Sequence, residues 1–357
     1  MERLRAGVVG LRRGRSHVRV LQALGQAEGG VEVAAVADSD GAVVERVSRE
    51  FGIPRGCSSL TELLDLGLDL VVLATPMPLH AAQAIEALEH GAHVMSEVPA
   101  VVDVAEAEAL IAAVERSGKQ YMMGENCCWW AVVDTARQLY RRGDFGRAFY
   151  AEAEYIHNLR HLVRDPDGAP TWRWGLAPIT YSTHSLGPLL WITGAYPLEA
   201  VCYGSSGNFE PGRIDLQTAL FRLTDGAVGR VTVSFANAHW GHHRYTLFGT
   251  QGSMDTGWVG RDEPRFQLPT LPNLPAPVTL PIGTDRPHAP RGATAGGHGT
   301  AEWFMYRDFL QALRDGTRPP LDVYDSVMYS LPGMLAAQAA GSGRAVAIPQ
   351  FQLRRPG

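Results

Sequence analysis

The sequence predicts an α/β protein of two domains, in which an open parallel sheet covered by helices is followed by an α+β domain with a large, mostly antiparallel sheet. The first third of the chain alternates short, continuously apolar runs with segments of helical periodicity, which is typical of strands buried on both faces and joined by crossover helices. Beyond residue 148, apolar and polar residues alternate, which is typical of antiparallel strands with one exposed face. A chain of 357 residues, 45% of them hydrophobic, is long enough for two domains.

Composition limits the partners and the compartment that we expect. The formal net charge of −5 gives no basic excess, so nucleic acid is not an expected partner. The four cysteines, Cys57, Cys127, Cys128 and Cys202, show no Cys-x-x-Cys spacing, and no secretory or transit segment precedes the first strand. We therefore expect reduced thiols and a cytoplasmic location. Apolar runs fall far short of the roughly 20 residues that span a bilayer, so we expect no membrane association.

The first predicted strand ends at Val8-Val9 and leads through a glycine turn into a helix over 12–24. The turn, Gly10-Leu11-Arg12-Arg13-Gly14, departs from the dinucleotide fingerprint Gly-x-Gly-x-x-Gly because Arg12 replaces the middle glycine and the spacing is Gly-x-x-x-Gly. Backbone N–H groups at such a helix start can still bind a pyrophosphate, and arginines can add charge. The alternative is a simple turn followed by a basic, solvated helix face.

Asp38 stands at the carboxyl end of the second predicted strand, over 31–37. An acid at this place in a doubly wound sheet typically bonds the adenosine ribose hydroxyls and repels a 2′-phosphate, which favours NAD over NADP. The alternative is that Asp38 or Asp40 only caps the helix that follows.

Two further strand ends carry polar motifs. The apolar run over 68–74 is followed by Thr75-Pro76-Met77-Pro78-Leu79-His80, and the next strand ends at Glu97-Val98-Pro99. Because ligands bind outside the carboxyl ends of parallel strands, both segments are predicted to line a reaction centre.

The order of these motifs resembles that of the glucose–fructose oxidoreductase and inositol dehydrogenase (Gfo/Idh/MocA) superfamily. Its members carry Thr-Pro-Asn-x-x-His at a turn that contacts the cofactor and Glu-Lys-Pro beside the nicotinamide; here Met77 replaces the asparagine and Val98 replaces the lysine. The only lysine, Lys119, is expected at a helix C-terminus and not in catalysis. The resemblance implies a Rossmann NAD-binding domain over 1–125. It implies a C-terminal α+β domain over 126–357 that binds substrate and makes a homodimer or homotetramer through its sheet.

The second domain carries a candidate catalytic segment over 178–188, where Tyr181 and His184 are three apart and share one face if the segment is helical. Dehydrogenases of the superfamily usually have an aspartate four residues before this histidine, where this chain has Thr180. The segment resembles instead the Tyr-x-Thr-His-x-Leu-Gly-Pro helix of the NAD-dependent α-N-acetylgalactosaminidases, a glycosidase branch. Other matches to that branch are Glu97-Val98-Pro99, Glu125-Asn126, Gly297-His298-Gly299 and Asp322-Val323-Tyr324-Asp325.

The motifs and the resemblance together give a set of expected site residues. The expected cofactor-binding residues are Gly10, Leu11, Arg12, Arg13, Gly14, Asp38, Thr75, Pro76, His80, Glu97, Val98, Pro99, Asn126, Trp172 and Arg173. The expected substrate-binding residues are Asn126, Trp172, Tyr181, His184 and His298. His239, His242 and His243 could suggest a metal site, but no metal is expected, because adjacent residues on a strand point to opposite faces and no carboxylate spacing accompanies the three histidines.

A nicotinamide dehydrogenase for secondary alcohols needs a base for the hydroxyl proton, and valine cannot serve. His184 titrates nearest neutrality and is the first candidate, with Tyr181 the second. We predict an NAD(H)-dependent oxidoreductase acting on a ring hydroxyl, C3 in particular, of a sugar, cyclitol or glycoside. The first alternative is a redox glycosidase, which oxidises the sugar, eliminates its C1 substituent, adds water and reduces the product. The second is a non-catalytic nucleotide-binding sensor, suggested by the altered glycine turn and the missing lysine.

Overall fold

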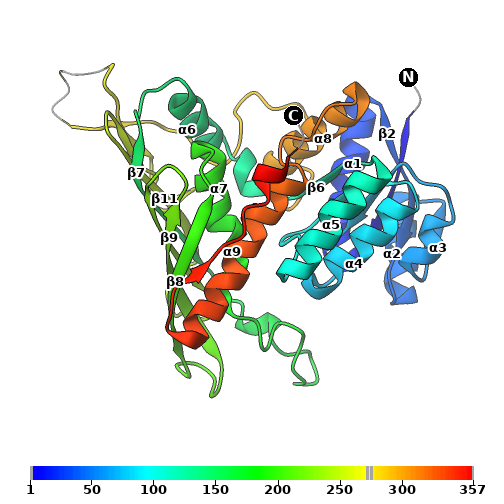
Figure 1. The fold of residues 1–357 in the computed structure, drawn as a ribbon. Helices are drawn as coiled ribbons and strands as arrows, with labels where there is room; N and C mark the ends of the chain where they lie inside the picture. The colour runs from blue at the N-terminus through cyan, green and yellow to red at the C-terminus, as the bar shows by residue number, and fades with distance from the viewer. Residues whose placement is uncertain (1–2, 271–272, 274–275, 356–357) are drawn as a thin grey trace. The chain divides into compact units, whose positions relative to one another are not determined.

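In the computed structural model, which describes residues 3–270, 273 and 276–355, the chain forms two compact units. The first comprises Met1–Trp129 and Asp285–Val327, and the second Trp130–Thr284 and Met328–Gly357. Figure 1 shows the course of the chain through both units.

The first unit is built on a fully parallel sheet with the strand order β3-β2-β1-β4-β5-β6. All four residues of β4 are buried, so helices cover both faces of the sheet. The order reverses between β1 and β4, which is where doubly wound sheets bind ligands. Its strands are β1 Leu4–Val9, β2 Val31–Ala37, β3 Arg55–Cys57, β4 Leu70–Leu73, β5 His93–Ser96 and β6 Tyr121–Met123. Its helices include α1 Leu11–Glu28, α2 Gly41–Phe51, α3 Leu60–Leu64, α4 His80–Glu89, α5 Val104–Ser117 and α8 Ala301–Asp315.

Helix α8 belongs to this first unit, which differs from the predicted boundary at 125/126. The helix packs against α1 and against the short 3₁₀ helix η2, Asn126–Trp129. Trp303 and Tyr306 of α8 are fully buried, and the indole N–H of Trp129 donates to Asp308 at 2.9 Å. The apolar face of α8 therefore completes the core of the parallel domain, although Trp129 and Asp308 are 179 residues apart in the sequence.

The second unit is built on a nine-strand sheet with the order β14-β13-β12-β11-β7-β10-β9-β8-β15. Among the described pairs only β7 and β10 run parallel, which confirms the predicted mostly antiparallel sheet. Its strands are β7 Ala148–Ile156, β8 Pro197–Ser206, β9 Ile214–Leu223, β10 Val228–Ser234, β11 His242–Gly249, β12 Ser253–Asp255, β13 Arg265–Gln267, β14 Val278–Thr279 and β15 Val346–Ala347. β13 and β14 lie in the proline-rich stretch over 263–291, part of which falls outside the described residues.

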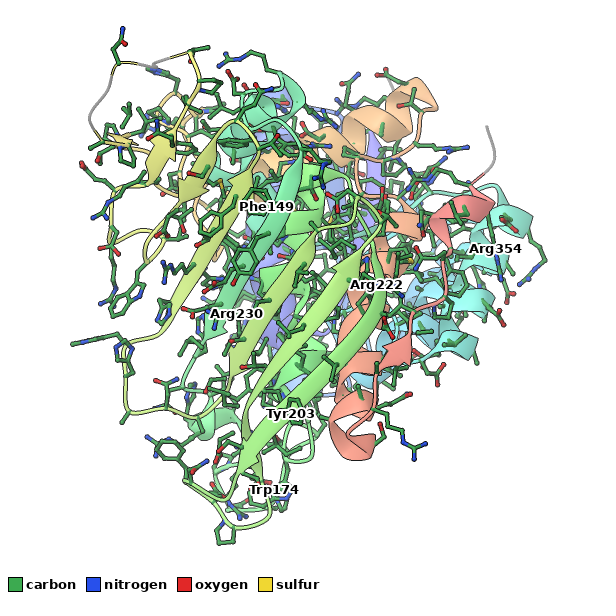
Figure 2. The ribbon with its side chains drawn as sticks, turned by 60° about the vertical axis from the view of Figure 1, so that its left-hand side comes forward. Phe149, Trp174, Tyr203, Arg222, Arg230 and Arg354 are labelled. Atoms are coloured by element: carbon green, nitrogen blue, oxygen red, sulfur yellow. The ribbon has the colours of Figure 1, made fainter. Side chains whose placement is uncertain are left out.

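Helices cover one face of this sheet, where α7 packs on β7, β10 and β11. The remaining helices of the unit are α6 Ala131–Arg141, which packs on α7, and α9 Val323–Ser342, which begins in the first unit. The opposite face, seen in Figure 2, presents Tyr203, Arg222 and Arg230 to the outside.

The predicted helix over 178–188 is divided in two. Pro178–Tyr181 form a 3₁₀ helix, η4, and α7 begins only at Thr183 and ends at Thr193. A Cβ at Gly333 of α9 would lie 2.5 Å from the carbonyl oxygen of Ile179 and from Oγ of Ser182. Close packing against α9 therefore sets the backbone at the junction, which the local sequence does not predict. None of the described helices is long and apolar enough to cross a membrane.

Candidate functional site

The turn after β1 has the shape of a dinucleotide-binding turn. Gly10 adopts a left-handed φ of 85°, and a Cβ there would lie 2.6 Å from the carbonyl carbon of Ala74. A Cβ at Gly14 would lie 2.9 Å from a methyl group of Val8, so both glycines allow α1 to start close against the sheet. Arg12 is exposed in the first turn of α1. This cradle fits a pyrophosphate despite the missing middle glycine.

Asp38 lies at the carboxyl end of β2 and faces this turn. Its Oδ2 accepts the backbone N–H of Leu11 at 2.7 Å, and its Oδ1 accepts that of Asp40 at 3.0 Å. The cap of α2 is Asp40, whose carboxylate accepts from Ala42 and Val43. Asp40 therefore caps α2, and the binding of an adenosine ribose by Asp38 stays a prediction.

His80 joins the two motif-bearing turns after β4 and β5. Its Nδ1 lies 2.9 Å from the carbonyl oxygen of Pro99 and its Nε2 lies 2.8 Å from that of Thr75. The ring is 2% exposed, and burial lowers its pKa. His80 therefore links the two turns through their backbone carbonyl groups, and its role in cofactor binding stays a prediction. Val98 is buried, and Pro76 is exposed.

Glu97, at the carboxyl end of β5, is held by two groups of α1. It accepts Nε–H of Arg13 at 2.7 Å and lies 2.8 Å from Nε2 of His17. Although burial raises the pKa of Glu97, the charge of Arg13 and the hydrogen bond from His17 hold that pKa well below its ordinary value. Glu97 is therefore an anion at neutral pH.

A second carboxylate, Glu302 of α8, binds the other end of Arg13 and approaches His298. Arg13 Nη2 donates to Glu302, His298 Nδ1 lies 2.8 Å from the same oxygen, and the backbone N–H of Gly297 donates at 2.9 Å. Burial raises the pKa of Glu302, but the bond from His298 and the charge of Arg13 bring it down to about 2. Arg13 and His298, which the sequence assigned to cofactor and substrate, thus lie in one cluster.

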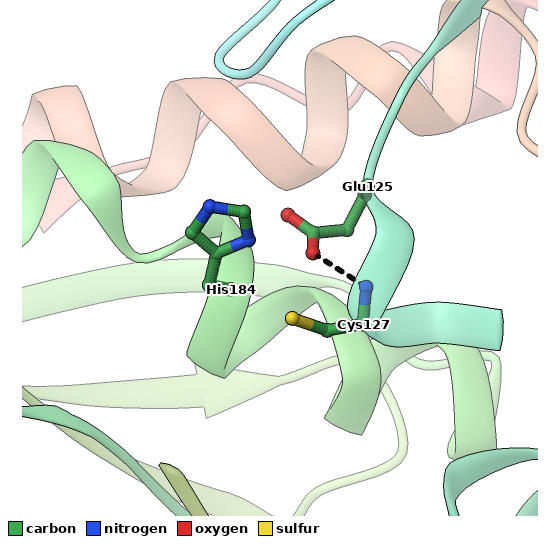
Figure 3. Close-up of side chains that lie close together, drawn as sticks. All are labelled: Glu125, Cys127 and His184. Atoms are coloured by element: carbon green, nitrogen blue, oxygen red, sulfur yellow. Dashed lines mark hydrogen bonds between the residues drawn. The ribbon is translucent and has the colours of Figure 1, made fainter. Parts of the chain in front are cut away.

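The chain that leaves β6 carries Glu125 and Asn126, both buried. Figure 3 shows the Glu125 carboxylate accepting the backbone N–H of Cys127, at 3.2 Å. Asn126 is 4% exposed, and its side-chain nitrogen has no hydrogen-bond partner among the described residues. A buried donor of this kind fits a predicted contact with a hydroxyl-rich ligand.

In the second unit, Tyr181 and His184 lie together although they belong to different helices. Tyr181 ends η4 and His184 lies in the first turn of α7, with 5.8 Å between their ring centroids. The ring of Tyr155 stacks on His184 at 5.2 Å, and the Tyr245 hydroxyl donates to the carbonyl oxygen of His184 at 2.6 Å. The predicted pairing of a phenol with an imidazole is therefore present, supported by two tyrosines from the sheet.

Two more histidines join this cluster. His157 and His243 place their Nε2 atoms 3.2 Å apart, and both rings pack near Tyr155. Sequence reasoning did not select Tyr155, His157 or His243. The alternation of the strands could have indicated Tyr155 and His243. Both lie on the covered face of the sheet, in β7 and β11, where aromatic side chains with polar atoms are unusual.

Trp172 and Arg173 lie on the connection between β7 and η4 and contact each other. The Arg173 guanidinium carbon lies 4.1 Å from the centroid of the Trp172 ring. The backbone N–H of Arg173 donates to Thr171 Oγ1 at 3.3 Å. The predicted role of this pair in ligand binding stays a prediction.

Known families match three parts of the chain. Residues 4–125 match the oxidoreductase family with an NAD-binding Rossmann fold, residues 133–255 the GFO/IDH/MocA C-terminal domain, and residues 288–355 the C-terminal domain of glycosyl hydrolase 109. The α-N-acetylgalactosaminidase of Shewanella oneidensis is 27% identical, in an alignment that covers 98% of this chain and 85% of that protein.

Solved structures share the fold. Levoglucosan dehydrogenase in complex with NADH and L-sorbose superposes with a TM-score of 0.84 at 21% identity, covering 98% of this chain and all of that one. An oxidoreductase from Agrobacterium radiobacter in complex with NAD+, L-tartaric acid and magnesium gives 0.80 at 19% identity, covering 99% and 100%. At these identities the likeness establishes the architecture of both units.

Proposed function

Because the chain belongs to the Gfo/Idh/MocA oxidoreductase superfamily, we propose that it uses NAD(H) to oxidise a ring hydroxyl, C3 in particular, of a sugar, cyclitol or glycoside. The observation that carries this proposal is the pairing of His184 with Tyr181 in a chain whose Rossmann unit has Val98 in place of a catalytic lysine. The imidazole and the phenol are then the groups that can exchange the hydroxyl proton.

The first unit supplies the cofactor site. Bound NAD+ is the hydride acceptor for the carbon that carries the hydroxyl. Gly10 and Gly14 let the backbone N–H groups of α1 approach the pyrophosphate, and Arg12 adds positive charge. The proposed cofactor contacts are Gly10, Leu11, Arg12, Arg13, Gly14, Asp38, Thr75, Pro76, His80, Glu97, Val98, Pro99, Asn126, Trp172 and Arg173.

The second unit supplies proton transfer. We assign His184 as the base that takes the hydroxyl proton and Tyr181 as its partner, able to donate or relay a proton. The stacking of Tyr155 and the backbone bond from Tyr245 fix the position of the imidazole, which favours a defined geometry for transfer. Asn126, Trp172 and His298 complete the proposed substrate contacts.

A redox glycosidase is the second candidate, favoured by the match of residues 288–355 to the glycosyl hydrolase 109 C-terminal domain. A ketone at C3 acidifies the proton on C2, and its removal by a base forms a C1–C2 double bond as the C1 substituent leaves. Water then adds across that bond, and return of the hydride to C3 leaves no net change of oxidation state. α-N-acetylgalactosaminides are the first glycosides to test, since a relative carries that name.

We also infer a homodimer or homotetramer formed through the open face of the nine-strand sheet. Large side chains are exposed on this face, including Tyr203 at 70%, Leu220 at 45% and Val228 at 45%. Exposed apolar patches of this kind often mark protein–protein contacts, and most oligomers pair identical copies of one chain.

All four cysteines are buried free thiols, which supports a reducing, cytoplasmic location.

The test is a panel of nitrophenyl glycosides and free sugars with NAD+, in which NADH absorbance and nitrophenol release are read together. NADH without nitrophenol is the expected result for a dehydrogenase and names its sugar. Nitrophenol release that requires NAD+ but accumulates no NADH would replace it with the glycosidase. Tight NAD+ binding with silence in both readings, across the panel and a set of cyclitols, would contradict both enzymes and support the sensor.

A further inference from the structure

A hydrogen-bonded network of six side chains joins three segments of the first unit that are distant in sequence. Its members come from α1, from the end of β5, and from α8 with the loop before it. They are Arg13, His17, Glu97, His298, Glu302 and Tyr306, and the Tyr306 hydroxyl lies 2.8 Å from Nδ1 of His17. The network therefore lies beside the glycine turn.

Within the network, Arg13 is committed to two carboxylates. Its Nε donates to Glu97 and its Nη2 to Glu302, whose side chain is 0% exposed. Although burial lowers the pKa of Arg13, the charges of Glu97 and Glu302 raise it above its ordinary value. Arg12, the preceding residue, is exposed. The two adjacent arginines thus differ in availability, because the charge of Arg13 is already satisfied internally while that of Arg12 faces solvent.

Glu302 also fixes the glycine-rich segment before α8. It accepts the backbone N–H of Gly297, and a Cβ at Gly296 would lie 1.8 Å from Glu302 Oε2. A Cβ at Gly297 would lie 3.1 Å from Arg13 Nη1. The segment therefore packs directly on the Arg13–Glu302 pair, and a side chain at Gly296 would also meet a methyl group of Val20 at 2.6 Å.

The N-terminus of α8 is itself filled by protein carboxylates. Gly297 N–H is taken by Glu302, and Thr300 N–H donates to Asp285 at 2.6 Å. These two N–H groups are therefore already bonded within the protein. The segment also brings His298 to the Arg13–Glu302 pair.

We propose that Glu302 is a positioning residue of the cofactor site, which acts on NAD through Arg13 and His298 without contacting it. In this scheme Glu302 holds Arg13 in place beside the first turn of α1, and the exposed Arg12 adds its charge at the pyrophosphate. The proposal rests on NAD use, which is part of the proposed function.

The test compares Glu302→Gln with the full-length wild type by calorimetric titration of NAD+ into substrate-free protein. Glutamine keeps an oxygen for the Gly297 N–H but removes the charge that holds Arg13. We expect the dissociation constant for NAD+ to rise roughly tenfold, which is the effect of losing one charge-assisted hydrogen bond. Glu50→Gln is the matched control, because Glu50 pairs with Arg15 of the same helix outside the network, and it should leave the constant unchanged.

A double-mutant cycle separates positioning from direct contact. If Glu302 acts through Arg13, Arg13→Gln and the Arg13→Gln/Glu302→Gln double variant should weaken NAD+ binding by similar factors. A double variant whose loss of NAD+ affinity equals the product of the two single losses would overturn the proposal. If Glu302→Gln lowers the melting temperature but leaves the dissociation constant for NAD+ unchanged, Glu302 serves only folding. If the variant binds NAD+ more tightly, the charge of Glu302 only repels the phosphates of the cofactor.

Two features keep this test separate from that of the proposed function. If Glu302→Gln does not fold, Arg13→Gln tests the same ion pair from its other end, at a side chain that is 30% exposed. If the wild-type protein does not bind NAD+, the proposed function fails. If the wild type binds and the variants bind equally well, only the role of Glu302 fails.

Discussion

His184 is held from two directions by tyrosines that the sheet supplies. Tyr155 stacks on the imidazole, and Tyr245 binds the backbone carbonyl of the same residue. These contacts set the position of the residue and of its ring. At the residue scale, the proposed reaction therefore depends on one imidazole whose removal should spare the fold of α7.

For His184→Ala, turnover should fall by roughly 10²-fold or more, as is typical for the loss of a general base. The dissociation constant for NAD+ should stay within about twofold, because the proposed cofactor cradle belongs to the other unit; a twofold change is about 0.4 kcal/mol. Steady-state rates on the sugar that the panel identifies measure turnover, and calorimetry measures the dissociation constant for NAD+. His242→Ala, on the opposite face of the sheet beside Glu154, is the control and should keep full turnover. Near-normal rates in His184→Ala would remove this residue from the mechanism.

Asp38 bonds the backbone N–H of Leu11, and substitution can separate this bond from the proposed contact with the adenosine ribose. Asp38→Asn keeps an oxygen for the Leu11 N–H, whereas Asp38→Ala loses both that bond and the charge. We expect both variants to narrow the preference for NAD+ over NADP+, because the repulsion of a 2′-phosphate depends on the charge. Only Asp38→Ala should also weaken the binding of NAD+ itself, by roughly tenfold, because it loses the bond to the Leu11 N–H. Dissociation constants for both cofactors give the ratio, and an unchanged ratio in both variants would contradict the ribose assignment.

At the scale of elements, α8 links the acid stability of the first unit to its cofactor site. Glu302 is fully buried and has a pKa of about 2 against an ordinary value of 4.5. A depressed carboxyl pKa adds stability that is present above pH 4.5 and is lost as the pH falls toward 2. The shift corresponds to on the order of 3 kcal/mol.

The free energy of unfolding should therefore fall less steeply between pH 4.5 and pH 2 in Glu302→Gln than in the wild type. Urea unfolding followed by circular dichroism at several pH values within that window measures this slope. Glu50→Gln, whose carboxylate is more exposed, should show a slope close to that of the wild type. Parallel slopes for the wild type and Glu302→Gln would show that this carboxyl titrates normally.

Local patterns predicted the elements that carry the cofactor turns, because each such turn lies at the end of a short apolar strand. Asp38 and Glu97 could be found in this way. Glu302 could not, because its bond to Arg13 joins residues 289 apart in the chain and no local spacing records it. The division of the segment over 178–188 was also missed, since the approach of α9 at Gly333 decides it.

At the scale of the whole molecule, the open face of the nine-strand sheet is the main surface left to explain. Cross-strand pairs on this face mix apolar and charged groups, as where Leu220 lies opposite Arg230 and Val228 opposite Arg222. Figure 2 shows Arg222, Arg230 and Tyr203 along it. The mixture suits a contact between two copies that is both apolar and charge-paired.

Leu220→Arg should therefore convert the wild-type oligomer to a smaller species, since it adds a third positive charge beside Arg222 and Arg230. Size-exclusion chromatography with light scattering measures the mass. Ala42→Arg, on an exposed position of α2, makes the same charge change elsewhere and should leave the mass unaltered. A wild-type protein that is monomeric at micromolar concentration would contradict the proposed assembly.

The return of residues 285–327 to the first unit also has a consequence for biosynthesis. At translation rates on the order of 5–20 residues per second, α8 is made roughly 10 to 40 s after β6. Throughout that interval Arg13 and His17 of the nascent Rossmann unit lack their partners from α8, Glu302 and Tyr306, and the flank of α1 that packs on α8 is uncovered. The parallel domain that begins at β1 is thus completed only after most strands of the second unit have been translated, and its maturation depends on α8.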